Sequence, residues 1–180
     1  MVGQLVERIR QKDQRAMSRL YQMYIEELSS VCYRYVPSES DAKDVLQNSF
    51  IKIFTLIPTF DYRDEPSFRA WMKRVVVNES LNYLKERKKL VFVTQDMDDL
   101  PITDDEGFML RHITADELHQ LISELPDGYR TVVNLHVFEG YSHKKIAELL
   151  NVEESTSGSQ LYFAKRLLAR KIKELIKKRQ

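Results

Sequence analysis

The chain has 180 residues, which suits one domain or two small ones, and its 43% hydrophobic content is enough for real cores. The formal net charge is only +1, so overall charge does not indicate a nucleic-acid partner, and the single cysteine, Cys32, excludes an intramolecular disulfide. No apolar run resembles a signal peptide or approaches membrane-spanning length, so we expect a soluble, cytoplasmic protein.

Apolar residues at helical spacing predict two helices before Pro58, with Pro37 between them. The first has the stripe Met17, Leu20, Tyr21, Tyr24, Leu28, Val31, Cys32 and Tyr35. The second begins near two serines that can cap it and has the stripe Leu46, Phe50, Ile53, Phe54 and Ile57. Turn residues in 59–67 then predict a loop.

A long third helix is expected from about Ser67 to Lys89, with apolar residues on two sides. One side carries Phe68, Trp71, Met72, Val75 and Val76, and the roughly opposite side carries Val77, Leu81 and Leu84. Such a helix must pack against different bodies along its length, or bend. Trp71 is expected in the core.

The remainder is predicted to be an acidic linker followed by four short helices. Residues 91–113 are aperiodic and acidic, which is typical of a linker. The helices are expected at about 115–125, 128–138, 143–150 and 155–178. The predicted fold class is therefore all-α, with two small helical domains, 1–90 and 114–180, joined by a flexible acidic linker.

Residues 142–170 have the pattern of a helix-turn-helix with a basic second helix. Ser142 can cap the first helix, and Asn151 tolerates the left-handed conformation of a sharp turn. Between Gln160 and Gln180, Lys and Arg stand at 165, 166, 170, 171, 173, 177, 178 and 179, against Glu174 alone. A helix lying against phosphates needs that charge. The alternative is an ordinary amphipathic hairpin with a solvated basic face.

Two other surfaces are candidates for binding. Asp44, Gln47 and Ile51 share a helical face and form either a docking patch or ordinary solvated surface. In the third helix, a row of amides and ammonium groups suits hydrogen bonding to nucleic acid, at Asn78, Asn82, Lys85 and Lys89. Nearby aromatics could stack on unpaired bases, namely Phe60, Tyr62, Phe68 and Trp71. The alternative is a solvated polar face above core aromatics.

Enzymatic interpretations find little support in the sequence. Asp104, Asp105 and Glu106 are adjacent carboxylates without histidine partners, and the four histidines lack ligand spacing. There is no phosphate-cradling glycine loop and no nucleophile elbow. We therefore expect no enzymatic activity, no catalytic residues, no metal, no cofactor and no small-molecule substrate.

Three motifs in order, DAKDVLQNSF (41–50), FRAWMKRVVVNESLNYLKER (68–87) and LPDGYRTVVNLHVFEGYSHKKIAELLNVEESTSGSQLYFAKRLL (125–168), resemble bacterial RNA polymerase sigma factors of the sigma-70 family, extracytoplasmic-function (ECF) group. The resemblance implies binding to core polymerase through Asp44, Gln47, Asn48 and Ile51. It implies minus-10 DNA contacts, partly single-stranded, by Tyr62, Arg63, Phe68, Lys73, Asn78, Asn82 and Lys85. It implies minus-35 contacts by Ser155, Thr156, Ser159, Gln160, Phe163, Lys165, Arg166 and Arg170.

The resemblance also implies a path for the linker toward the polymerase active site and RNA exit, and an anti-sigma partner, often membrane-anchored. Gly158, Gln160 and Phe163 depart from the family pattern, which commonly has basic residues there. Phosphate contact then rests more on Lys165, Arg166 and Arg170. Two rival functions stay open. One is a free-standing helix-turn-helix regulator, and the other is a nucleic-acid enzyme using the acidic loop.

Overall fold

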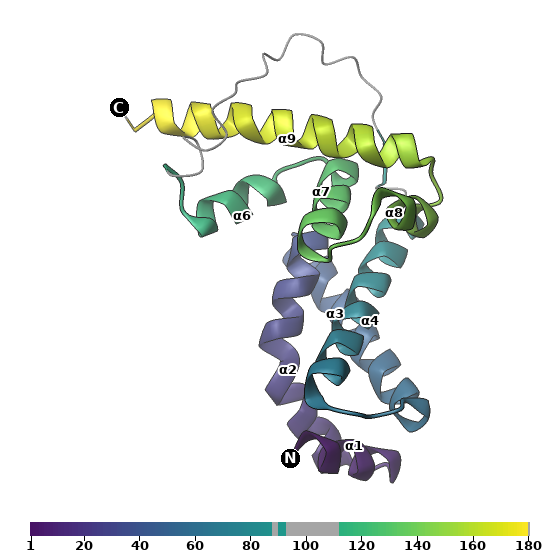
Figure 1. Cartoon of the computed structure of the whole chain (residues 1–180). Coiled ribbons are helices and arrows are strands. Elements are labelled where there is room, and N and C mark those ends of the chain that lie inside the picture. Colours follow the sequence, from purple (N-terminus) through teal and green to yellow (C-terminus); the bar gives the residue numbers. More distant parts are fainter. Residues whose placement is uncertain (88–89, 93–111, 180) are drawn as a thin grey trace. The chain divides into compact units, whose positions relative to one another are not determined.

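The computed structural model describes residues 1–87, 90–92 and 112–179, and these divide into two compact units, Met1–Arg87 and Lys88–Gln180. All regular structure in the described residues is helical, as predicted (Figure 1). The predicted linker, 91–113, lies outside the described residues except at its two ends. None of the described helices is long and apolar enough to cross a membrane.

Unit 1 is built from four α-helices and one short 3-10 helix. Their bounds are α1 Val2–Arg10, α2 Gln14–Tyr35, α3 Glu39–Leu56, η1 Ile57–Thr59 and α4 Glu65–Glu86. Helices α2, α3 and α4 pack against one another, and α1 packs against α2 and η1. Helix α1 was not predicted, although Val2, Leu5, Val6 and Ile9 have helical spacing and are buried.

The predicted apolar stripes form the core of unit 1. Leu20, Tyr24 and Leu28 of α2 and Ile53 of α3 are almost completely buried, although Met17 and Tyr21 of the first stripe are not. Helix α4 buries Met72 and Val76 as well as Val77 and Leu84, because it packs on both α2 and α3. The expectation for Trp71 was only partly right, because its side chain is half-buried.

Side-chain caps fix two helix starts in unit 1. The Asp13 carboxylate accepts hydrogen bonds from the backbone N–H groups of Arg15 and Ala16, at 2.9 and 3.2 Å, at the start of α2. Asp64 accepts from the Ser67 N–H at 2.7 Å, so α4 begins at Glu65 and not at Ser67 as predicted. Such caps satisfy backbone donors that a helix leaves unpaired.

Unit 2 contains α6 Ala115–Ser123, α7 Asp127–Val133, η2 Asn134–Phe138, α8 His143–Leu150 and α9 Glu154–Lys177. The helix predicted at 128–138 is in fact α7 continued by a wider π-helical turn, η2. Ser142 caps α8 by accepting from the Lys145 N–H at 3.2 Å, and Asn151 has φ 55° and ψ 53°. Both features were predicted: Ser142 fixes the start of α8, and the left-handed Asn151 makes the sharp turn between α8 and α9.

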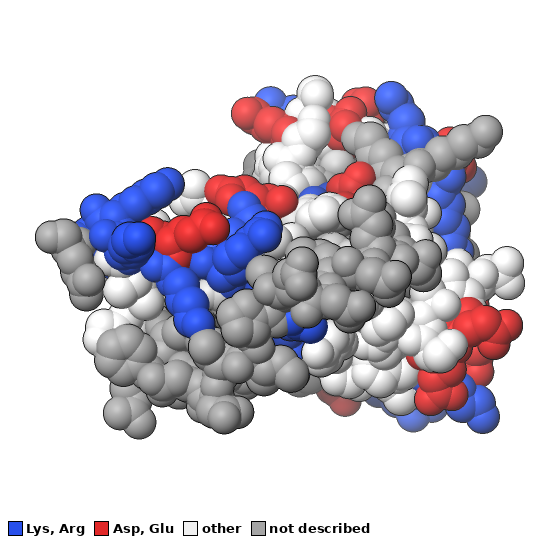
Figure 2. All heavy atoms as spheres, turned by 90° about the horizontal axis from the view of Figure 1, so that it is seen from above, with Lys and Arg blue, Asp and Glu red and all other residues white. Residues whose placement is uncertain are grey.

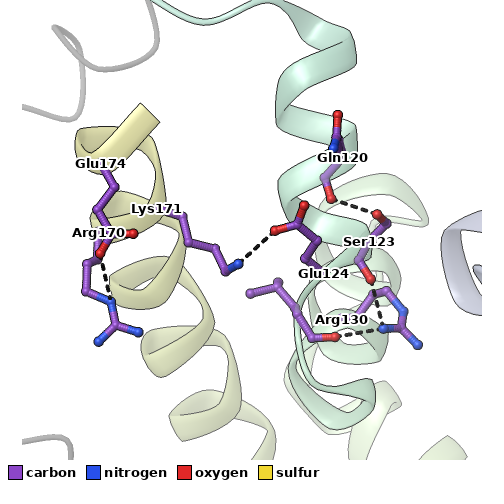
Figure 3. A network of polar contacts seen from close by, with 8 residues as sticks. Gln120, Ser123, Glu124, Arg130, Arg170, Lys171 and Glu174 are labelled. Carbon is purple, nitrogen blue, oxygen red and sulfur yellow. Dashed lines mark hydrogen bonds and ion pairs between the residues drawn. The ribbon is translucent and has the colours of Figure 1, made fainter. Parts of the chain in front are cut away.

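Helix α9 supplies one wall of the unit 2 core and packs on α6, α7 and α8. Its buried face includes Ser157, Leu161, Ala164 and Leu167. Arg130 of α7 is almost fully buried, and its guanidinium donates to the carbonyls of Ser123 and Leu125 (Figure 3). It also pairs with Asp127. Because a buried cation needs partners, these bonds tie the end of α6 to α7.

Candidate nucleic-acid interface

The expected docking residues of α3 form one exposed face. Asp44, Gln47, Asn48 and Ile51 are all exposed, and Ile51 keeps 58% of its surface accessible. Gln47 and Ile51 also line a groove between α2 and α3 whose other walls include Tyr21, Ile25, Tyr33, Phe50 and Phe54. The face therefore offers a carboxylate and two amides beside apolar surface, a combination that suits a protein partner.

The predicted polar row of α4 is exposed as well. Asn78, Asn82 and Lys85 all point away from the core of unit 1. The Asn82 amide donates to Glu79 at 3.5 Å, and Glu79 pairs with Lys52 of α3 at 2.6 Å. Arg74, one turn before Asn78, is exposed and extends the row; sequence reasoning missed it, although its spacing of four residues from Asn78 was visible. Lys89, the last member expected, lies outside the described residues.

Lys73, which the resemblance assigns to minus-10 contacts, lies away from that row. Lys73 precedes Asn78 by five positions, which places its side chain about 140° from that of Asn78 around the helix axis. Its ammonium group lies 2.7 Å from the carboxylate of Glu27 on α2, and Arg69 lies 3.3 Å from the same carboxylate. These two ion pairs join α4 to α2, and the Lys73 side chain keeps 38% of its surface accessible.

Phe68 also departs from its expected role, because its side chain is completely buried and cannot stack on a base in this conformation. It lies at the centre of an aromatic cluster, with ring centroids 5.5 Å from Phe60, 5.6 Å from Trp71 and 5.7 Å from Tyr62. Phe60 and Trp71 stack at 4.4 Å. Tyr62 is half-buried and Arg63 is exposed, so the cluster packs against the inner side of the loop 60–64 that carries both residues.

On α9, seven of the eight expected minus-35 residues lie at the surface and one is buried. Ser155, Lys165 and Arg170 are exposed, and Thr156, Ser159, Phe163 and Arg166 are half-buried at the surface. Gln160 is completely buried on the same face as Ser157 and Ala164, so in this conformation it does not reach DNA, in contrast to the expectation. Its Oε1 lies 3.3 Å from the position that a Cβ on Gly128 of α7 would occupy. Gln160 therefore faces α7 and not the solvent.

Tyr162 is a surface residue of α9 that sequence reasoning missed. It is 46% exposed, and Arg166 both donates to its hydroxyl at 3.1 Å and lies over its ring at 5.4 Å. Its position three residues after Ser159 and four before Arg166 already indicated the same face. The structure thus adds an amphipathic aromatic ring to the exposed face of α9.

Positive charge gathers over the C-terminal part of α9, with acidic side chains among it (Figure 2). Lys171 pairs with Glu124 of α6 at 2.8 Å, and Arg179 pairs with Glu117. Arg170 lies 3.9 Å from Glu174 on its own helix (Figure 3). Part of the basic flank therefore holds α6 and α9 together. Lys165 and Arg166 precede these residues and lie near the middle of α9.

No group of three or more metal-binding side chains occurs among the described residues. The acidic stretch 104–106 lies outside them. The titratable groups with clearly shifted pKa values near the core are structural. Burial raises the pKa of Cys32 to about 11 and, with the nearby Glu65, that of Tyr24 to about 12. Both groups keep their protons at neutral pH and offer no nucleophile.

Comparisons with known proteins match each unit to a family model and nearly the whole chain to relatives. The family model described as Sigma-70 region 2 matches residues 20–90, and the one described as Sigma-70, region 4 matches residues 115–168. The "ECF RNA polymerase sigma-E factor" of Haemophilus influenzae is 31% identical over 187 residues, covering 96% of this chain and 95% of that protein. The protein of the same name from Salmonella typhimurium is 31% identical over 186 residues, covering 97% and 95%.

A solved structure, "Structure of CnrH in complex with the cytosolic domain of CnrY", is 20% identical with a TM-score of 0.48 and covers 94% of this chain and 96% of that chain. The two helical units, the helix-turn-helix and the matches at both units define a sigma-70 family protein. Within that family, this chain belongs to the ECF group of RNA polymerase sigma factors.

Proposed function

We propose that this protein binds core RNA polymerase, directs it to promoters and helps to open the DNA at the minus-10 element. The observation that carries the proposal is an exposed polar row on α4 of unit 1 in addition to the exposed face of α9 in unit 2. A regulator of duplex DNA needs only a helix-turn-helix, which α8 and α9 supply. Such a regulator has no use for the exposed row Asn78, Asn82 and Lys85 in unit 1. Unpaired bases are a ligand that suits this row.

For polymerase docking, the proposal assigns the exposed face of α3. Asp44 supplies a carboxylate for a basic partner surface, and Gln47 and Asn48 supply amide donors and acceptors. Ile51 and the groove beside it supply apolar area that a partner would cover. Charged groups around an apolar centre are the usual arrangement of a specific protein interface.

For the minus-10 element, the proposal assigns the α4 row and the loop before it. Asn78 and Asn82 can bond base edges, and Lys85 and Arg74 can bond phosphates. Tyr62 and Arg63 of the loop are accessible to a flipped base, with the buried Phe68 as support. Flipping a base costs a few kcal/mol of unstacking, which such contacts must offset.

For the minus-35 element, the proposal assigns the exposed face of α9. Lys165, Arg166 and Arg170 contact phosphates and position the helix. Nearer the N-terminus, the residues that face bases are Ser155, Thr156, Ser159, Tyr162 and Phe163. The N-terminal part of a recognition helix is the part that enters the major groove.

The proposal includes no catalysis and no small-molecule substrate. A polymerase partner places the protein in the cytoplasm. The resemblance to ECF sigma factors is the support for a further partner, an anti-sigma factor that can be anchored in the membrane. Such a factor would compete with polymerase for the surfaces assigned above.

Run-off transcription tests the proposal directly. Purified core polymerase is assayed with and without this protein on a promoter selected from a random-sequence library by the reconstituted holoenzyme. We expect a discrete transcript only when both proteins are present. Binding to a palindromic duplex without polymerase, together with no transcript, would instead favour a free-standing regulator.

A further inference from the structure

Helix α1 lies beside the loop of residues 60–64, which joins η1 to α4 at one end of unit 1 (Figure 1). The apolar face of α1, Val2, Leu5, Val6 and Ile9, is buried, and the helix packs on α2 and η1. That packing accounts for the apolar residues of α1. It does not account for two other residues, Gly3 and Arg10, which both approach the loop.

Arg10 holds the loop through the backbone of Phe60. Its Nη2 donates to the Phe60 carbonyl oxygen at 2.6 Å, and its Nη1 lies 2.5 Å from the Glu7 carboxylate. The Arg10 side chain is 31% exposed, so water screens these bonds only in part. The planar guanidinium can serve both partners at once, because its donors point in fixed and different directions.

Gly3 contacts the loop at a second point. A Cβ at Gly3 would lie 3.0 Å from the Cε1 atom of the Tyr62 ring. That distance is well inside ordinary carbon–carbon contact. A Cβ at residue 3 would force the Tyr62 ring to shift, so glycine lets the ring lie directly against α1.

The opposite wall of the loop comes from α4. Phe60 stacks on Trp71 at 4.4 Å, and Tyr62 packs on Phe68 at 5.7 Å. Asp61 and Arg63, which alternate with these two aromatics, are exposed and pair with each other at 3.1 Å. The loop is thus held from α1 and from α4, with alternate side chains facing the solvent.

We infer that Arg10 and Gly3 are positioning residues, which hold the 60–64 loop in the conformation that captures the opened DNA strand. The inference rests on the proposed function of that loop. A loop that is already ordered does not have to be ordered when a base binds, and this saves conformational entropy. Helix α1 thereby promotes strand opening without contacting DNA.

The first experiment measures the loop in the protein alone. Trp71 is the only tryptophan, and Phe60 stacks on it, so acrylamide quenching of its fluorescence reports whether the loop stays in place. Arg10→Ala should increase the quenching constant about twofold, because loss of a hydrogen bond from a charged donor frees the Phe60 backbone. Arg10→Lys, which keeps one donor for the carbonyl, should lie between Arg10→Ala and the wild type.

Arg8→Ala is the matched control. It removes the same charge from the same helix, but Arg8 pairs with Asp13 at 2.7 Å and not with the loop. Gly3→Leu is a second, independent variant, because leucine favours the helix but would displace the Tyr62 ring. It should increase quenching while the far-UV circular dichroism of the protein is unchanged, so a general loss of folding cannot account for the result.

The second experiment measures strand opening by the holoenzyme with permanganate, which reacts with unpaired thymines. Arg10→Ala should lower thymine reactivity in the minus-10 region about tenfold, on the order of one lost charge-assisted hydrogen bond. Gly3→Leu should lower it as well, because the leucine displaces the Tyr62 ring. Affinity for core polymerase and for minus-35 duplex should be unchanged. Arg8→Ala should match the wild type in every assay.

Equal quenching in the wild type, Arg8→Ala and Arg10→Ala would overturn the inference, and so would normal thymine reactivity in Arg10→Ala. Failure of the wild-type protein to open any promoter is a different result. It would contradict the proposed function of the loop, and with it the role of α1 in strand capture. The quenching arm would still report separately whether α1 holds the loop.

Discussion

Arg166 and Tyr162 form one unit on the exposed face of α9, because the guanidinium donates to the phenol oxygen at 3.1 Å and covers the ring at 5.4 Å. The arrangement holds the Tyr162 ring on the exposed face of α9. Tyr162 can then present its ring edge to a thymine methyl group or its hydroxyl to a base. The two residues are therefore expected to act together in DNA recognition.

We predict different effects for Tyr162→Ala and Lys165→Ala. Tyr162→Ala should change which minus-35 sequences are preferred, by about 1–3 kcal/mol at the affected base pair. Lys165→Ala should weaken binding to all sequences alike and reduce the salt slope by about one. Binding measured over a sequence library at several salt concentrations separates the two. A change of preference in Lys165→Ala with an unchanged salt slope would reverse the assigned roles.

The face of α3 is expected to carry affinity for core polymerase. Replacing Asp44 and Gln47 together by alanine should weaken binding by about 2–4 kcal/mol, at about 1–2 kcal/mol for each lost interfacial hydrogen bond. The affinity is measured by titration of labelled protein with core polymerase. Glu39→Ala, on the first turn of the same helix, is the control for a lost surface carboxylate. An unchanged affinity in the double variant, with intact circular dichroism, would remove the assignment.

Gly158→Ala should stabilise unit 2. Gly158 lies inside α9, and a Cβ there would meet no other atom within 4 Å. Glycine in a helix interior costs about 1 kcal/mol relative to alanine, so the free energy of unfolding should rise by about that amount. Urea denaturation followed by circular dichroism measures it. A lowered urea midpoint would contradict this prediction.

Protonation of Asp13 should lower the stability of the protein as the pH falls below about 4. The hydrogen bond from Arg8, and then those from the backbone N–H groups of Ala16 and Arg15, lower the pKa of Asp13 from its usual value. A carboxyl whose folded pKa is depressed contributes stability above its unfolded pKa and loses it as the pH falls through the folded pKa. Asp13→Asn keeps a cap acceptor without this titration. Its urea midpoint should fall less between neutral pH and pH 3 than that of the wild type. Identical pH dependence would contradict this role.

Much of the fold could be predicted from local pattern. Ser142 and Asn151 are local signals, and as expected the first marks the start of α8 and the second marks the turn after it. Gln160 and Phe68 could not be placed in this way, because their burial depends on which faces of α9 and α4 meet neighbouring helices. The start of α1 lacks a side-chain cap at Met1, so only its short apolar stripe could have indicated a helix.

The roles within the candidate site were harder to predict than the surfaces themselves. The exposed rows on α3 and α4 followed from helical spacing, since residues opposite a buried stripe face solvent. The ion pair of Lys73 with Glu27 could not be predicted, because Glu27 lies on another helix and no local sequence signal joins the two. Tyr162 was missed because an aromatic residue beside an apolar stripe can equally well belong to the hydrophobic core.

Permanganate footprinting of the minus-10 region tests the central claim most directly, namely that unit 1 holds melted DNA. With wild-type holoenzyme, thymines there should react. Combined replacement of Tyr62 and Asn78 by alanine should nearly abolish that reactivity, because stacking contributes about 1–3 kcal/mol for each captured base. Closed complexes should persist, and a premelted template should largely restore transcription. Gln22→Ala, an exposed change on α2, should behave as wild type. Normal thymine reactivity in the Tyr62 and Asn78 double variant would show that α4 and its loop are only scaffold.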